Sequence, residues 1–303
     1  MWFLFSLLTA LAWGGADLFY KKGSDSNDKY SHIKIIIMVG LVMGIHATAY
    51  MIIKDVHFSP MDMIHYLPVS ALYILSMAFG YIGLRYIELS IASPIQNSSG
   101  AVTSVLLFIF FTHQLSVLEL LGIIIITAGI VGIAVLEKRA EDEARRLNSE
   151  QIDKKYQIGF LAIMFPILYC IIDGLGTFAD AIYLDELNLI SENSALLAYE
   201  YTFFTCAIVS FIYLRFFKKE SFHVFKERDK GIAAILETTG QFFYVFAMAS
   251  GNAIIAAPLI ASYSIFSVIL SRIFLKEKLT KKQYLIIAFV IFGIILLGIA
   301  DEL

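Results

Sequence analysis

The sequence has little charge and few residues that interrupt helices. Asp, Glu, Lys and Arg make up 16% of its 303 residues, whereas soluble domains carry about 25%. With 59% hydrophobic residues and a mean hydropathy of +0.76, a water-soluble globular fold is excluded. Five prolines and 19 glycines are too few for a disordered or collagen-like polymer. The composition therefore predicts a helical membrane protein with several crossings, and it excludes nucleic acid as a natural partner.

Cysteines and catalytic motifs are equally scarce. The two cysteines, Cys170 and Cys206, lie inside apolar runs, where a lone thiol behaves as a small hydrophobe. The sequence contains no Cys/His cluster, no His-Glu-x-x-His, no Walker loop and no nucleophile elbow. We therefore expect no catalytic residues, no metal site, no cofactor and no enzymatic activity.

Ten apolar runs are each long enough to cross a hydrocarbon core of about 30 Å. They lie at residues 2–21, 33–53, 67–87, 93–113, 116–136, 157–183, 194–216, 231–249, 253–275 and 282–300. The first run has no basic segment before it and no small-residue cleavage site after it, so it does not resemble a cleaved signal peptide. The predicted fold class is an all-α integral membrane protein with ten transmembrane helices.

The two halves of the chain are related by a shift of 164 residues. This shift superimposes Pro94 on Pro258 and Ser98 on Ser262. Because each half crosses the membrane five times, the second half must enter from the opposite face, and the repeats are predicted to be inverted. The predicted domains are a first repeat, a linker that carries both signs of charge, and a second repeat, at residues 1–137, 138–156 and 157–303.

Three short motifs carry a family resemblance. They are Leu11-Ala-Trp-Gly-Gly-Ala, the run from Gly83 to Pro94, and Phe274-Leu-Lys-Glu-Lys-Leu-Thr280 followed by Gly293. With these motifs the sequence resembles the two EamA repeats of the drug/metabolite transporter superfamily. The resemblance implies a substrate cavity lined by helices one to four and six to nine, with helices five and ten at the periphery. The sequence departs from the pattern at His113, where the first repeat would more often carry the glutamate found at Glu277.

Basic residues are distributed unevenly between the two predicted faces. Of the 23 Lys and Arg residues, 22 lie in or beside the connections at one face, and only Lys54 lies at the other. By the positive-inside rule the basic face is cytoplasmic. Both termini are therefore predicted to be extracytoplasmic, in a multi-pass protein of the cell (plasma) membrane. The family resemblance implies the opposite orientation, because its ten-helix members usually have both termini in the cytoplasm.

Two carboxylates lie within apolar helices at comparable positions of the two repeats. Asp17 follows Trp13, and Asp173 follows Tyr169, by four residues. Residues four apart share one face of a helix, so each helix presents an aromatic ring beside a negative charge. This pairing favours an organic cation, which is attracted by both groups. The alternative for Asp17 is structural, since it lies near a helix end and four residues before Lys21.

Helices seven and eight add further polar residues. Glu237, Gln241 and Tyr244 are spaced to share one helix face, and we predict that all three bind substrate. Glu200 lies in the outer third of helix seven, where it either binds substrate or is buried against a partner helix. A carboxylate at membrane depth costs a few kcal/mol on insertion scales, so each of these acids is a candidate functional residue.

For other polar and aromatic residues, the sequence allows two interpretations each. Gln96 and Asn97 either bind a ligand or hold helices together through hydrogen bonds. Tyr81 and Tyr263 form either cavity walls or ordinary packing. His46 is the only histidine well inside a helix, and we favour a satisfied core histidine over a proton relay.

These residues predict a secondary transporter that moves a small cationic or zwitterionic organic solute by alternating access. Candidate solutes are a quaternary ammonium compound such as choline, an amino acid, a polyamine or a cationic drug. We predict that Glu237, with Asp173 as the second choice, exchanges the solute for a proton. A dehydrated carboxylate is stabilised by a bound cation or by a bound proton, so it can alternate between them. The expected partners are the small-molecule substrate and the lipid bilayer, and the expected state is a monomer or homodimer.

Two alternatives stay open. A neutral nucleobase or nucleoside would be recognised by Gln96, Asn97 and Gln241 and not by charge. A non-transporting membrane scaffold would bind no ligand saturably, and it would leave the acid and aromatic pairs without a purpose. An anionic substrate is disfavoured, since the deep part of the helices lacks a Lys or Arg pair that would offset its charge.

Overall fold

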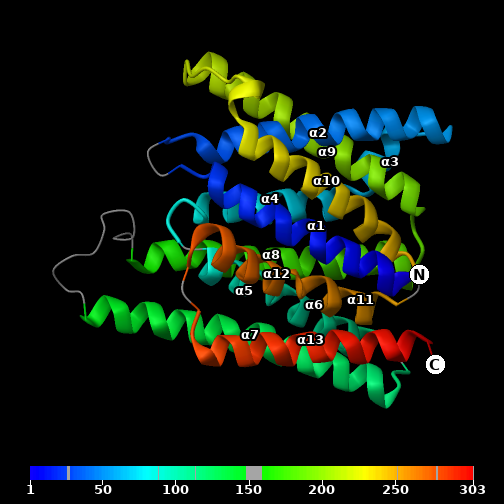
Figure 1. Ribbon diagram of the computed structural model, residues 1–303. Coiled ribbons are helices and arrows are strands. Elements are labelled where there is room, and N and C mark those ends of the chain that lie inside the picture. Colours follow the sequence, from blue (N-terminus) through cyan, green and yellow to red (C-terminus); the bar gives the residue numbers. More distant parts are fainter. Residues whose placement is uncertain are drawn as a thin grey trace.

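The computed structural model describes residues 1–25, 28–87, 89–112, 114–147, 159–250, 252–277 and 279–302. Within these ranges the regular structure is entirely helical, which confirms the predicted all-α class. Figure 1 shows a bundle of helices that run side by side between two ends, with the N- and C-termini marked at the same end.

The described residues form thirteen α-helices, seven of them in the first half of the chain. They are α1 (Trp2–Gly23), α2 (Ser31–Lys54), α3 (Pro60–His65), α4 (Leu67–Gly83), α5 (Leu89–Asn97), α6 (Ser99–Phe110) and α7 (Val117–Leu147). The second half contains six more. They are α8 (Gly159–Ala181), α9 (Glu192–Ile212), α10 (Arg228–Met248), α11 (Ala253–Ala261), α12 (Tyr263–Leu270) and α13 (Lys281–Glu302). Wider helical turns at Ile182–Glu186, Tyr213–Phe217 and Ser271–Leu275 extend α8, α9 and α12.

Eight described segments are long and apolar enough to cross a membrane. They are Trp2–Gly23, Ser31–Lys54, Val117–Leu136, Met164–Glu186, Glu192–Phe217, Arg228–Met248, Ala253–Leu275 and Lys281–Ala300. The third predicted crossing, α4, is a shorter apolar helix. The fourth is divided into α5 and α6. Eight long spans are therefore present, and the number ten stays a prediction.

Prolines divide one segment in each half at the same repeat position. Pro94 lies inside α5, which ends three residues later at Asn97, and Pro258 lies inside α11, which ends three residues later at Ala261. Proline lacks the backbone N–H donor and its ring crowds the preceding turn, so it weakens a helix at this point. These breaks are not among the predictions from the sequence, in which the crossings 93–113 and 253–275 are each one continuous helix.

Helix α7 is longer than the apolar run that predicted it. It continues to Leu147, so residues 138–147 of the predicted linker are helical. Glu, Lys, Arg and Ala dominate this stretch and are strong helix formers, which explains the extension. The rest of the predicted linker, residues 148–156, lies outside the described residues, as does His113.

The helices pair in a pattern that maps onto itself when the two halves are exchanged. Helix α1 packs against α10 and α12, and its repeat counterpart α8 packs against α4 and α6. Two other pairs join counterparts directly, α2 with α9 and α7 with α13. Figure 1 shows α7 and α13 along one edge of the bundle, where the family resemblance places helices five and ten.

Glycines allow two of these pairs to approach closely. A Cβ atom on Gly40 of α2 would lie 2.5 Å from the Phe203 carbonyl oxygen of α9. A Cβ on Gly129 of α7 would lie 2.1 Å from Val290 Cγ2 of α13. Small residues at such contacts are typical of helix pairs in membranes.

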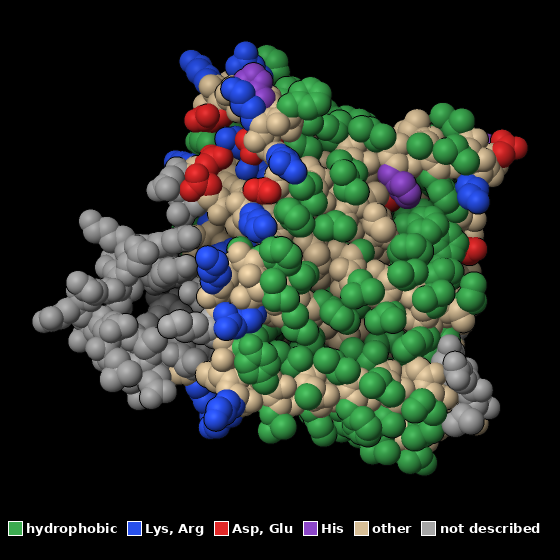
Figure 2. Space-filling model, in the orientation of Figure 1, with side chains coloured by type: hydrophobic (Ala, Val, Ile, Leu, Met, Phe, Trp, Pro, Cys, Tyr) green, Lys and Arg blue, Asp and Glu red, His purple; other side chains and the backbone are tan. Residues whose placement is uncertain are grey.

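Charge is concentrated at one end of the bundle, which we call the basic end. Figure 2 shows most of the visible Lys and Arg side chains there, and a broad apolar surface between the two ends. Beside α1 at this end, Lys34 Nζ lies 2.6 Å from Asp28 Oδ2, and Lys230 pairs with Glu227. Burial opposes ionisation of Asp28, but hydrogen bonds from Lys34 and the Tyr30 N–H outweigh it and lower its pKa.

Candidate functional site

A central cavity lies between the helices of the two halves. It holds about 820 Å³ of empty space, including the part open to solvent, and side chains from α1, α4, α5, α6, α8, α9, α10, α11 and α12 line it. Helices α2, α7 and α13 contribute no lining residue. Eleven of the twelve predicted site residues line this cavity: Trp13, Asp17, Tyr81, Gln96, Asn97, Tyr169, Asp173, Glu237, Gln241, Tyr244 and Tyr263.

Aromatic side chains form much of the cavity wall. The eight rings are Trp13, Tyr20, Tyr73, Tyr81, Tyr169, Tyr199, Tyr244 and Tyr263. The Trp13 ring centroid lies 5.2 Å from that of Tyr244 and 5.7 Å from that of Tyr263. Trp13 Nε1 also donates a hydrogen bond to the Glu237 carbonyl oxygen at 3.2 Å. The indole is therefore held by α10 and α12 together.

The aromatic rings of Trp13 and Tyr169, which precede Asp17 and Asp173 by four residues, each lie against a glycine of a neighbouring helix. A Cβ atom on Gly240 would lie 2.3 Å from Trp13 Cδ1, and one on Gly80 would lie 2.8 Å from Tyr169 Cδ2. Both glycines belong to the helix that packs against the ring's own helix, α10 in one case and α4 in the other. In both halves, therefore, a glycine on the neighbouring helix leaves space for the aromatic ring that lies beside a carboxylate.

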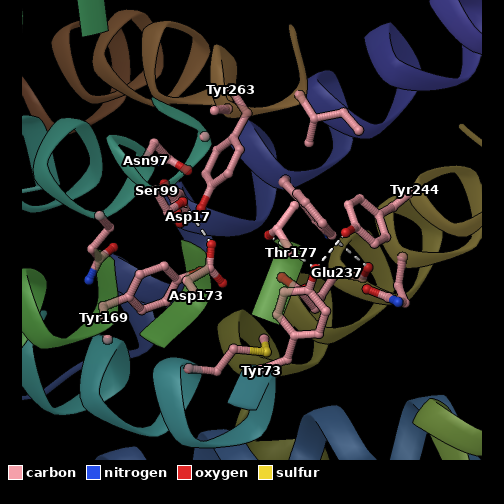
Figure 3. A pocket seen from close by; sticks show the side chains of 18 of the residues that line it. Asp17, Tyr73, Asn97, Ser99, Tyr169, Asp173, Thr177, Glu237, Tyr244 and Tyr263 are labelled. Carbon is pink, nitrogen blue, oxygen red and sulfur yellow. Dashed lines mark hydrogen bonds between the residues drawn. The ribbon is translucent and has the colours of Figure 1, made fainter. Parts of the chain in front are cut away.

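Three carboxylates face the same cavity, and among the described residues that line it there is no Lys, Arg or His. Figure 3 shows Asp17, Asp173 and Glu237 directed toward the space between the labelled tyrosines. Asp17 Oδ2 accepts hydrogen bonds from Ser93 Oγ at 2.6 Å and Ser267 Oγ at 2.7 Å. Lys21, which the sequence offered as a partner for Asp17, donates instead to the carbonyl oxygens of Leu84 and Ile87.

The other two carboxylates differ in how firmly they are held. Asp173 accepts from Ser99 Oγ at 2.8 Å and from Ser76 Oγ at 3.3 Å. Glu237 accepts a single, longer hydrogen bond, from Tyr20 OH at 3.4 Å. Among the three acids, Glu237 therefore has the fewest protein hydrogen bonds to lose when a ligand binds.

Two tyrosine contacts lie toward opposite ends of the cavity. Near the basic end, Tyr81 OH donates to Tyr20 OH at 3.2 Å, with ring centroids 4.8 Å apart. Toward the other end, the hydroxyls of Tyr73 and Tyr244 form a short hydrogen bond, and Tyr73 OH donates to Thr177 Oγ1 at 3.1 Å. Both contacts join helices of different pairs across the cavity, α1 with α4 in one case and α4 with α10 in the other.

Glu200 is the one predicted site residue that the structure places outside the cavity. It is fully buried between α9 and α2, where both of its carboxylate oxygens lie 2.9 Å from His46 Nδ1. Its neighbour Tyr199 lines the cavity, and one residue is about 100° of helix rotation, which directs Glu200 to α2. The arrangement fits burial against a partner helix and a satisfied histidine.

Several lining residues were not predicted. Tyr20 follows Asp17 by three residues and shares its helix face, so its spacing alone could have identified it. Tyr73 lies at the repeat position of Glu237. Thr177 continues the face of Tyr169 and Asp173. Each of the three therefore has a sequence signal, and the structure shows that all three face one cavity.

Comparison with known proteins identifies the family. The profile of the EamA-like transporter family matches residues 1–135 and 160–299. A solved structure titled only "Crystal structure of protein" superimposes with a TM-score of 0.67 over 99% of this chain and 96% of that chain, at 12% identity, which supports the fold alone. A search of curated proteins gave no match. The chain therefore belongs to the EamA-like transporter family of the drug/metabolite transporter superfamily, as its motifs predicted.

Proposed function

We propose that this protein is a secondary transporter for small organic cations, or for zwitterions through their ammonium group. The observation that carries the proposal is the cavity lining, which combines three carboxylates and eight aromatic rings with no basic side chain. A cation that leaves water needs compensating interactions. The ring faces supply about 0.5–2 kcal/mol each, and the carboxylates supply the opposite charge.

The same lining disfavours anions. An anionic solute would face Asp17, Asp173 and Glu237 without a guanidinium or ammonium group in the cavity to balance its charge. The hydroxyl groups that surround the acids, such as Ser93 and Ser267, already donate to a carboxylate and are not free to hold a second anion.

Transport would proceed by alternating access between two inverted five-helix repeats. In this proposal α4 and the joined α5 and α6 supply the two crossings that complete a set of ten. The self-mapping helix pairs support a two-fold relation between the repeats, and an odd number of crossings in each repeat requires the inversion. The basic end would face the cytoplasm and both termini the outside of the cell, according to the positive-inside rule.

Proton exchange would occur at Glu237, with Asp173 as the second choice. A dehydrated carboxylate is stabilised by a bound proton or by a bound cation, so one acid could release its proton when it binds the cationic substrate. Glu237 suits this role because Tyr20 is its one hydrogen-bond donor, at 3.4 Å. Asp17 and Asp173 are each held by two serine hydroxyls.

A neutral nucleobase or nucleoside is the second candidate substrate. It is favoured by Gln96, whose buried Nε2 has no hydrogen-bond partner among the described residues and lines the cavity. An amide donor of this kind would bind a carbonyl or ring nitrogen of a base. Asn97 is less available, because its side chain already donates to Ser93.

A thermal-shift screen of the purified protein separates the two candidates. A ligand at 100 times its Kd stabilises the folded state by about 2.7 kcal/mol. We expect alkylammonium and quaternary ammonium compounds to raise the unfolding temperature, and their uncharged isosteres to leave it unchanged. Equal stabilisation by the uncharged isosteres would contradict the cation proposal, and stabilisation by nucleobases alone would support the second candidate. Glu237→Gln is the matched variant, since it keeps the side-chain shape and removes the charge.

A further inference from the structure

A fourth carboxyl group lies behind the cavity wall and has no role in the proposed binding site. Asp180 is in the last turn of α8, seven residues beyond Asp173 and on the same helix face. Its exposure is 0%, and it is not a lining residue of the cavity. Tyr66 OH donates a hydrogen bond to Oδ1, while Oδ2 is buried with no hydrogen-bond partner.

The surroundings of Asp180 offer no positive charge. The titratable groups that face it from the neighbouring helices are the phenols of Tyr66, Tyr73, Tyr199 and Tyr244. Along its own helix the neighbouring acids are Asp173, seven residues earlier, and Asp185 and Glu186 in the wider turn that extends α8. Within the described part of the chain, no Lys, Arg or His forms an ion pair with it. A charged carboxylate without a partner is costly to bury, so the neutral acid fits this position.

Asp180 is linked to the tyrosine contact at the end of the cavity opposite the basic end. Tyr73 and Tyr244, whose hydroxyls form that contact, both face the Asp180 carboxyl. Tyr73 also donates to Thr177 Oγ1, on α8 between Asp173 and Asp180. Side chains of three helices, α4, α8 and α10, therefore meet at this carboxyl, and the Tyr73–Tyr244 contact joins two of these helices.

We propose that Asp180 is a proton-binding site outside the substrate cavity, and that it holds its proton while the Tyr73–Tyr244 contact is closed. The proposal rests on the proposed transport function, because it makes the Tyr73–Tyr244 contact a gate at one end of the substrate cavity. When the proton leaves to water, the charged carboxylate has tyrosine hydroxyls as its neighbours and no cation among the described residues to balance its charge. Separation of α4 and α10 from α8 admits water to it. Because linkage is reciprocal, opening favours proton release as much as release favours opening.

Infrared difference spectroscopy tests the protonation state without any substrate. In the purified protein at neutral pH, the wild-type spectrum minus the Asp180→Asn spectrum should contain the C=O stretch of a protonated carboxyl group. Asp55→Asn is the control, since Asp55 is exposed in the turn after α2, and its difference spectrum should lack that band. Tyr66→Phe should shift the band to higher frequency, because it removes the donor to Oδ1. The assignment would be overturned if the wild-type minus Asp180→Asn spectrum lacks the band, or if Tyr66→Phe does not shift it. If Asp180→Asn does not fold, the Tyr66→Phe spectrum decides.

Cysteine labelling tests the gate. With Cys170 and Cys206 replaced by alanine, Met77→Cys places a thiol in the cavity wall for a small uncharged reagent. Its labelling rate, divided by that of the exposed control Ser221→Cys, should rise by about fivefold or more from acid to alkaline pH, the lower limit of usual coupling. Adding Asp180→Asn should remove this rise. A rise that persists in the Asp180→Asn background would refute the gate. Neither measurement uses an organic cation, so failure of the cation screen would leave both results interpretable.

Discussion

Replacing Gly240 by alanine probes how tightly the cavity wall is packed around Trp13. An alanine Cβ at this position would lie 2.3 Å from Trp13 Cδ1 and 2.5 Å from Nε1, well inside normal contact distance. Gly240 is on the same helix as Glu237, whose carbonyl oxygen accepts the indole hydrogen bond at 3.2 Å. The indole must therefore move away from α10, and this hydrogen bond and the packing against Tyr244 are disturbed together.

Two magnitudes follow from this displacement. Overpacking a well-filled interior costs about 1–3 kcal/mol of folding stability, so the unfolding temperature should fall. A ring face contributes about 0.5–2 kcal/mol to binding a cation. Its displacement should weaken cation binding about 2- to 30-fold. The assays are thermal unfolding of the purified protein and titration with the alkylammonium compound that gives the largest thermal shift.

Gly231→Ala on the same helix is the matched control. Its Cβ would have Met38 Sδ as the nearest atom, at 4.0 Å, which is an ordinary van der Waals contact. This variant should bind cations with wild-type affinity, and it should be equally or more stable, since alanine is favoured over glycine in a helix by about 1 kcal/mol. If Gly240→Ala keeps both wild-type stability and wild-type affinity, Trp13 is not held against α10 in the way the structure describes.

Four further predictions concern charge and topology. Glu237→Gln or Asp173→Asn should abolish transport in proteoliposomes while expression and monodispersity stay near wild type; normal transport by both would make the acids structural. Lowering the pH should weaken cation binding competitively in the wild type and not in Glu237→Gln, and an affinity that is constant between about pH 5 and 8 would contradict proton exchange. A cysteine at Ser24 should be shielded from an impermeant thiol reagent outside intact cells while one at Ser191 reacts, and the reverse pattern would contradict the orientation. The pKa of Asp28 is lowered in the folded state, so this carboxylate stabilises the fold above its unfolded pKa and loses that effect as the pH falls through its folded pKa. Asp28→Asn should therefore reduce the loss of thermal stability below about pH 4. An acid profile equal to that of the wild type would contradict the pairing of Asp28 with Lys34.

The sequence alone determined the class of protein, its family and much of the cavity lining. Hydropathy located the apolar helices because a membrane span requires a continuous apolar run. The spacing of Trp13 with Asp17, and of Tyr169 with Asp173, placed each pair on one helix face, because helical rotation depends only on position along the chain. The structure directs these residues into one cavity. Their role in binding a substrate stays a proposal.

The tertiary structure decided how residues on different helices meet. Glu200 and His46 are far apart in the sequence, and only the packing of α2 against α9 shows that they pair. The contact between Tyr73 and Tyr244, and the burial of Asp180 behind it, likewise depend on how α4, α8 and α10 converge. Local sequence patterns report the face of a single helix, whereas the neighbour that covers that face is set by contacts over the whole chain.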